Sequence, residues 1–254
     1  MKFLLEDKVC RAEIFSAEES TSITVASGRN LPLVFMFIGD YTDELDCQLK
    51  EYIVPQICAG KVSPFILASY GPVDWDKDYS PWYAVGSKGR IFYGGAKEYV
   101  SFIQERFLPK LKEIYPVSEK VYTLGYSLGG LAALYYYYEL ELSGCISCSG
   151  SLWYPGWREY LEAQLKRKNP VIKQQEAAEQ TKDRIYLSLG GKEKNTSDVF
   201  MCHIEECTKE TYERLKAYAD VTFVHEPGGH MCKVNLRLAH GLCWLFNNKG
   251  LTKG

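Results

Sequence analysis

Three features that would assign this sequence to other classes of protein are missing from it. No apolar run approaches the roughly 20 residues that a membrane-spanning helix needs. The formal net charge of −2 leaves no positive surplus to offset phosphates, which excludes a general nucleic-acid binder. The opening segment, Met1 to Asp7, becomes acidic too early for a signal peptide. We therefore expect a cytoplasmic protein that binds neither nucleic acid nor membrane.

Histidine is also scarce, since the 254 residues include only four. Few combinations of residues could therefore form a metal site, and none has the spacing of a zinc centre. The nearest candidates are Cys202, His203 and Cys207, which would not converge on one helix, and His225, His230 and Cys232, which lack a further pair. The nine cysteines suit thiols in a reducing compartment better than a disulfide framework. We expect neither a metal nor another cofactor.

Apolar strand-like runs alternate with helical patterns along most of the chain. The expected strands lie at 8–16, 21–27, 31–38, 65–69, 121–124, 144–148, 184–189 and 221–224. Helical patterns cover 43–59, 96–115 (with a kink at Pro109), 158–168, 172–181, 198–219 and 233–247. This alternation predicts an α/β fold, a mostly parallel twisted sheet with helices on both faces. Because no linker or repeat interrupts it, we expect one domain over 1–254, with aromatic loop excursions at about 70–95 and 149–160 over the active site.

Residues 121–130 combine a short apolar strand with the pattern Gly-x-Ser-x-Gly and a run of small residues. This order is typical of a strand that turns sharply into a helix, with Ser127 exposed at the turn. A serine hydroxyl is a weak nucleophile and needs a base to accept its proton as it attacks. The pattern therefore predicts a nucleophile at Ser127, provided that a base and an orienting acid follow.

The base and the acid can be selected by their positions after strands. His230 follows Gly228-Gly229 on a loop beyond the last strand, whereas the other histidines fall within helices or a strand. We predict His230 as the general base. Glu193, in the turn after the strand at 184–189, is the preferred acid, and Asp198 is the alternative. The resulting order of serine, acid and histidine is that of α/β-hydrolases.

An oxyanion formed during attack needs preorganised N–H donors. The amide of Leu128, next after the nucleophile, is the first expected donor. The second should come from the loop after the strand at 31–38, where we assign Asp40, with Tyr41 next in line.

These pieces together resemble the putative-esterase family of α/β-hydrolases, which includes esterase D-like enzymes, enterochelin esterases, feruloyl esterases and mycolyltransferases. The resemblance is carried by residues 125–130, the Ser-Gly-Ser-Leu-Trp run at 149–153, Gly190-x-x-Glu193 and Gly229-His230. It implies an α/β-hydrolase fold with about eight strands, and it supports Glu193 as the acid. Many relatives have His-Gly where this chain has Gly39-Asp40. A carboxylate beside a forming oxyanion would be unfavourable unless its side chain points away.

Loop aromatics above the sheet are candidate walls of a substrate pocket. The residues expected there are Tyr41, Tyr126, Trp153, Trp157 and the segment 75–83. The tyrosine run at 135–138 falls in a helix, where we expect a mixture of core and surface positions.

The function that these features predict is hydrolysis of a small-molecule carboxylic ester through an acyl-enzyme. Two alternatives use the same fold. One is an acyltransferase with the same triad, and the other is a catalytically silent binding protein.

Overall fold

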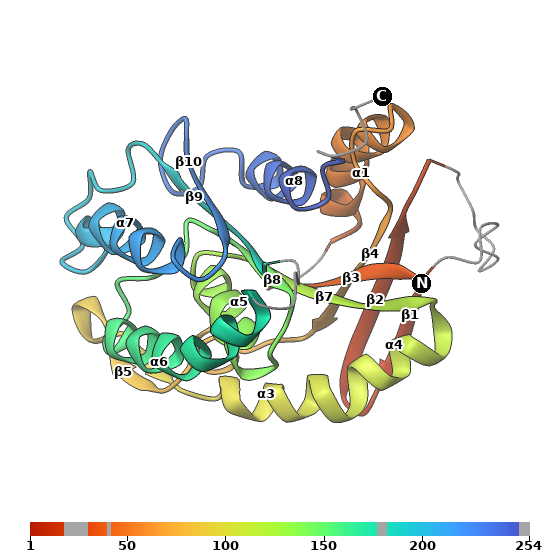
Figure 1. Ribbon diagram of the computed structural model, residues 1–254. Coiled ribbons are helices and arrows are strands. Elements are labelled where there is room, and N and C mark those ends of the chain that lie inside the picture. The colour runs from red at the N-terminus through yellow and green to blue at the C-terminus, as the bar shows by residue number, and fades with distance from the viewer. Residues whose placement is uncertain (18–29, 40–41, 177–181, 249–254) are drawn as a thin grey trace.

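The computed structural model describes residues 1–17, 30–39, 42–176 and 182–248, and these build one large sheet with helices around it (Figure 1). Its strands are β1 (Lys2–Leu5), β2 (Lys8–Phe15), β3 (Leu31–Phe37), β4 (Phe65–Gly71), β7 (Val117–Tyr126), β8 (Gly144–Cys148), β9 (Arg184–Gly190) and β10 (Asp220–Glu226). Their order across the sheet is β1-β2-β4-β3-β7-β8-β9-β10. Six adjacent strands, β4, β3, β7, β8, β9 and β10, run parallel, while β2 is antiparallel to both β4 and β1 at one edge. The expected mostly parallel sheet of eight strands is confirmed.

The N-terminal strands differ in part from the expectation. The strand expected at 8–16 is β2, and it pairs with β1, which the sequence did not indicate. The strand expected at 21–27 lies outside the described residues.

The sheet has two buried faces because apolar residues fill both sides of its central strands. In β3, Leu33, Phe35 and Phe37 pack on one face, and Val34 and Met36 on the other. Helices α1 (Asp43–Cys58) and α8 (Val234–Leu245) cover the second face (Figure 1). The first face is covered by α3 (Ala96–Phe102), α4 (Leu108–Ile114), α5 (Leu128–Glu139), α6 (Trp157–Glu176) and α7 (Ile204–Leu215). Continuous apolar runs are what a strand buried on both faces requires.

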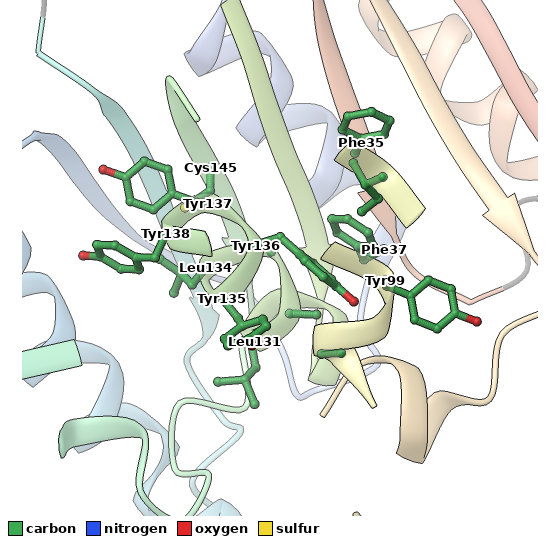
Figure 2. Close-up of a cluster of buried hydrophobic side chains, with 14 of the residues drawn as sticks. Phe35, Phe37, Tyr99, Leu131, Leu134, Tyr135, Tyr136, Tyr137, Tyr138 and Cys145 are labelled. Carbon is green, nitrogen blue, oxygen red and sulfur yellow. The ribbon is translucent and has the colours of Figure 1, made fainter. Parts of the chain in front are cut away.

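Helix α5 is enclosed on all sides, and this explains its unusual composition. Every residue from Leu128 to Tyr138 is buried, so the expectation of surface positions within the tyrosine run 135–138 is wrong. Figure 2 shows Tyr136 on one side of the helix, towards Phe37, and Tyr137 and Tyr138 together on the other. Tyr136 stacks on Phe37 of β3 with ring centroids 4.6 Å apart, while Tyr137 and Tyr138 lie on the side of Cys145. A helix that is apolar all round is typical of a fully buried element.

The structure divides one of the expected helices into two and joins two others into one. The helix expected over 96–115 is divided into α3 and α4 by a π-helical stretch, Ile103–Phe107. Pro109 lies just beyond this stretch and cannot donate to the carbonyl of residue 105, which disturbs the α-helical pattern there. The two helices expected at 158–168 and 172–181 are instead the single helix α6, anchored on the core by Leu161 and Leu165. Residues 177–181 lie outside the described part.

The aromatic excursion at 70–95 contains short elements rather than irregular loop alone. It holds α2 (Trp75–Asp78) and a small antiparallel hairpin, β5 (Tyr83–Val85) and β6 (Ile91–Tyr93). The hydroxyl of Tyr136 donates to the Asp78 carbonyl at 2.9 Å and that of Tyr99 to the Asp78 carboxylate at 2.7 Å, which ties the excursion to α5 and α3. No helix in the described ranges combines the length and the apolar character needed to cross a bilayer.

Candidate active site

The turn between β7 and α5 holds Ser127 in a conformation that few residues other than glycine adopt. Its backbone has φ 57° and ψ −121°, between the last residue of β7 and the first of α5. Two glycines make this turn possible. A Cβ at Gly125 would lie 1.9 Å from the carbonyl oxygen of Gly129, and one at Gly129 would lie 1.8 Å from that of Phe37. The strand, turn and helix therefore pack too closely for any side chain at these positions.

Ser127, His230 and Glu193 form a continuous chain of hydrogen bonds. The Nε2 atom of His230 lies 2.9 Å from the Ser127 hydroxyl oxygen, and its Nδ1 lies 2.6 Å from Glu193 Oε2. An ionised carboxylate only accepts hydrogen bonds, so Nδ1 carries the proton and Nε2 presents its lone pair to the serine. Such an arrangement can withdraw the proton from an attacking hydroxyl.

Glu193 is buried, yet it is held as a carboxylate. Its side chain is 0% exposed, and its second oxygen, Oε1, accepts from the Gly190 amide at 2.6 Å and from the Ser149 hydroxyl at 2.6 Å. Burial by itself raises the pKa of Glu193, but hydrogen bonds from His230, Ser149 and the Gly190 amide outweigh it and hold the pKa below its usual value. The ionised form can therefore orient an imidazole and stabilise it once protonated.

Asp198, the alternative acid, serves a different set of contacts. Its Oδ1 accepts from the amides of Phe200 and Met201, each at 3.0 Å, and its Oδ2 accepts from the Ser87 hydroxyl. These bonds fasten the loop before α7 to the turn of the β5–β6 hairpin. The hydrogen bond from Ser87 is the main cause that lowers the pKa of Asp198. Glu193, and not Asp198, is hydrogen-bonded to His230.

Only one of the two expected oxyanion donors lies in the part of the chain that the structure describes. Leu128 is the first residue of α5, where an amide has no partner within its helix, and it lines the same cavity as Ser127 and His230. The other expected donor, Asp40, and its neighbour Tyr41 lie outside the described residues.

A cavity of about 190 Å³ opens directly on Ser127. Its walls come from the excursion at 70–95, the loop after β8, the loop before α7 and the triad itself. The residues that line it are Trp75, Ser87, Arg90, Phe92, Ser127, Leu128, Ser151, Trp153, Asp198, Met201 and His230. Arg90 is neutralised here by Asp76, with Nε 3.0 and 3.1 Å from the two carboxylate oxygens. The walls therefore combine three aromatic side chains, Trp75, Phe92 and Trp153, with polar groups and one ion pair at the edge.

Of the aromatic residues expected in the pocket, Trp153 and Trp75 line this cavity, while two others face elsewhere. Trp157 is 2% exposed and donates from Nε1 to Thr211 Oγ1 at 3.4 Å, so it packs between α6 and α7. Tyr126 lies behind the histidine, and its hydroxyl donates to the His230 carbonyl. Neither residue lines the cavity at Ser127, although Trp157 lines a second cavity of about 470 Å³ that shares Trp153 with it.

One buried residue at the site, Arg237, was not predicted from the sequence. Arg237 on α8 is 1% exposed and contacts Glu193; an arginine within an otherwise apolar helical pattern was the available signal.

Cys145 and Cys148 have Cys-x-x-Cys spacing, which can indicate a redox pair. Both are buried in β8, in clusters on opposite faces of the sheet, so they cannot act as one. Among the described residues, no three histidines, cysteines or acids are grouped to bind a metal.

An eight-stranded sheet of this order, with a serine at a tight strand-to-helix turn, defines the α/β-hydrolase fold. The chain belongs to the family described as "Putative esterase", whose model matches residues 20–230. It is thereby assigned to the class of carboxylic ester hydrolases.

Several known proteins are similar to this chain at low sequence identity. The uncharacterised protein YbbA of Bacillus subtilis is 24% identical over 192 residues, which are 73% of this chain and 71% of that protein. The siderophore hydrolase EstB of Aspergillus nidulans has a TM-score of 0.71 at 17% identity, over 99% of this chain and 96% of that one. An IroE-like serine hydrolase from Shewanella oneidensis has a TM-score of 0.70 at 16% identity, over 94% and 75% of the two chains.

Proposed function

We propose that this protein hydrolyses a carboxylic ester through an acyl-enzyme formed on Ser127, with His230 as the general base and Glu193 as the acid that orients it. One observation carries the proposal. A continuous hydrogen-bonded chain joins the hydroxyl to Nε2 of His230 at 2.9 Å and Nδ1 to Glu193 at 2.6 Å. Membership of an esterase family supports the same chemistry.

In the first half of the reaction, the Ser127 oxygen attacks the carbonyl carbon of the ester while His230 Nε2 accepts the hydroxyl proton. Glu193 stabilises the imidazolium, and the Leu128 amide donates to the oxyanion. The amide of residue 40 stays our candidate for the second donor. When the tetrahedral intermediate collapses, the imidazolium passes its proton to the departing alkoxide, and an alcohol leaves.

In the second half, water takes the place of the alcohol. His230 removes a proton from the water as its oxygen attacks the acyl carbon, and it then returns a proton to Ser127 as the carboxylic acid departs. An acyltransferase would differ only in the nucleophile that enters at this stage. Adding short alcohols and measuring ester against acid products distinguishes the two, and we expect acid to predominate.

The dimensions of the cavity favour a compact acyl group. Its volume of about 190 Å³ is below the range of roughly 300–1,000 Å³ that is usual for drug-sized ligands. The half-buried Trp75 and Trp153 offer ring surface for contact with a planar group. We therefore expect short and aromatic acyl esters to be cleaved faster than long-chain esters. Because EstB is named a siderophore hydrolase, siderophore esters belong in the same panel of substrates.

A fluorophosphonate probe tests the nucleophile directly. The native protein should be labelled, whereas Ser127→Ala should be unlabelled and should lose activity by a factor on the order of 10⁵. Ser101→Ala, a serine on the exposed side of α3, is the matched control and should be labelled normally. Absence of labelling in the native protein would instead favour a catalytically silent binding protein.

A further inference from the structure

A buried arginine lies behind the acid of the proposed triad. Arg237 is 1% exposed and belongs to α8, the helix that follows the loop carrying His230. Its Nη1 lies 2.8 Å from Glu193 Oε1, the oxygen that His230 does not use. Since arginine is almost never fully buried unless it is paired, this ion pair has a specific role to explain.

The same guanidinium contacts each segment that carries or supports the triad. Its Nη2 donates to the Gly229 carbonyl at 2.9 Å and to the Pro227 carbonyl at 3.2 Å, on the loop of the histidine. Its Nη1 is 2.8 Å from the hydroxyls of both Tyr126 and Ser149. One planar group thus joins the last residue of β7 to the loops after β8, β9 and β10.

Two of these partners extend the contact to His230 and Glu193. Tyr126, the residue before the nucleophile, donates its hydroxyl to the carbonyl of His230. Ser149 donates to Glu193 Oε1 at 2.6 Å. Arg237 is therefore connected to both residues of the acid–base pair through polar groups that are themselves buried.

Gly190 leaves no room for a side chain beside the guanidinium. A Cβ at Gly190 would lie 2.4 Å from Arg237 Nη2 and 2.7 Å from Glu193 Oε1. The chain therefore approaches the ion pair closely enough to bring the Gly190 amide within 2.6 Å of Glu193. Glu193 Oε1 is enclosed by donors, and this leaves Oε2 directed at the histidine.

We propose that Arg237 is a positioning residue for catalysis: it fixes the carboxylate plane of Glu193 and the loop of His230 so that the imidazole faces Ser127. The inference rests on the proposed function of the triad. Arg237 does not touch the cavity and does not exchange protons, because a guanidinium stays charged in proteins. Its charge also has a measurable consequence. A buried cation 2.8 Å from the Glu193 carboxylate disfavours proton uptake at that carboxylate.

The test is the pH profile of kcat/KM for an activated short-chain ester, with active sites counted by fluorophosphonate labelling. Arg237→Met should lower kcat by about 10²-fold with little change in KM, because the base loses its alignment. It should also move the acidic limb of the profile upward by about one pH unit, since the opposing charge is gone. Arg237→Lys should leave the limb near its native position and still lower kcat, because an ammonium cannot reproduce the planar fork.

Arg184→Met provides a matched control. Arg184 also donates to carbonyls of α8, including that of Trp244 at 3.0 Å, but it lies at the opposite end of β9 from the Gly190–Glu193 turn. Its loss should lower the melting temperature without changing the limb or the kcat per labelled site.

Native kcat and a native acidic limb in Arg237→Met would overturn the proposal. If that variant does not fold, native kcat in both Arg237→Lys and Tyr126→Phe would overturn it equally. A lower kcat in Arg237→Lys and in Tyr126→Phe, with the acidic limb of the pH profile unmoved, would support the proposal. Failure of the triad itself is a separate result, because the native protein would then not be labelled at Ser127.

Discussion

Glu193 and Asp198 lie five residues apart in one connection, yet they have different roles at the site. The turn from Gly190 to Glu193 brings the Glu193 carboxylate within hydrogen-bond distance of His230 and Ser149. Asp198 lies further along and accepts backbone amides of its own loop. Both residues follow the same strand, β9. Because the Asp198 carboxylate accepts hydrogen bonds from its own loop, it is not available to orient the imidazole.

This difference leads to a prediction for the two single variants. Glu193→Gln should lower kcat by about 10³- to 10⁴-fold, because a neutral amide neither fixes the imidazole tautomer nor stabilises the imidazolium. Asp198→Asn should cost far less activity and should mainly lower the melting temperature, since it weakens the bonds to Phe200, Met201 and Ser87. Steady-state kinetics and thermal melts of both proteins check this. A larger kinetic loss in Asp198→Asn would reverse the assignment of the acid.

At the scale of elements, the β7–α5 unit depends on close backbone packing. The turn at Ser127 places α5 against β3 and β7, with the Gly129 Cα next to the Phe37 carbonyl. Because the obstructing atoms belong to backbone, no change of side-chain rotamer can relieve a clash there. The glycines of the motif are thus required for packing as well as for exposure of the serine.

Gly129→Ala should consequently destabilise the protein by about 3 kcal/mol or more, or prevent folding, because an added methyl group overlaps the Phe37 carbonyl. Gly191→Ala is a suitable control, since its Cβ would meet nothing closer than the Glu226 carbonyl at 3.7 Å. Urea unfolding followed by tryptophan fluorescence measures both. Equal midpoints for the two variants would contradict the packing argument.

At the scale of the whole molecule, several carboxylates have pKa values below their usual range. They are Glu13, Asp43, Glu193, Asp198 and Glu205. The largest lowering is at Glu205, where hydrogen bonds from Lys194 and Lys209 bring the pKa to about 2. The folded protein therefore binds fewer protons than the unfolded chain in the acidic range, and its stability rises with pH there.

The free energy of unfolding should accordingly be near its full value above about pH 4.5, the upper end of unfolded carboxyl pKa values. It should decrease as the pH falls from there towards 2, through the lowered pKa values of the folded state. Urea midpoints measured at pH 7, 5 and 3 test this. Glu205→Gln should reduce the difference between pH 5 and pH 3, and a midpoint independent of pH would contradict the prediction.

Three features could be predicted from the sequence: the alternation of strands and helices, the turn at Ser127, and the order of Ser127, Glu193 and His230. These features depend on local periodicity and turn chemistry, which a chain expresses over about ten residues. The directions of Trp157 and Tyr126 could not be predicted, because a helix start and a strand pleat decide which way each ring points. That α6 continues as one helix could not be predicted either, because packing against the core outweighs the local sequence signals that favoured two helices.

The sequence by itself thus determined the class of fold and the predicted nucleophile, base and acid, since each is a short pattern at a strand end. Only the tertiary structure decided which side chains meet. The contact of Ser127 with His230 spans 103 residues, and that of Glu193 with Arg237 spans 44. Residues so far apart in the sequence meet because parallel strands bring their carboxyl ends to one edge of the sheet, and no local sequence pattern predicts such contacts.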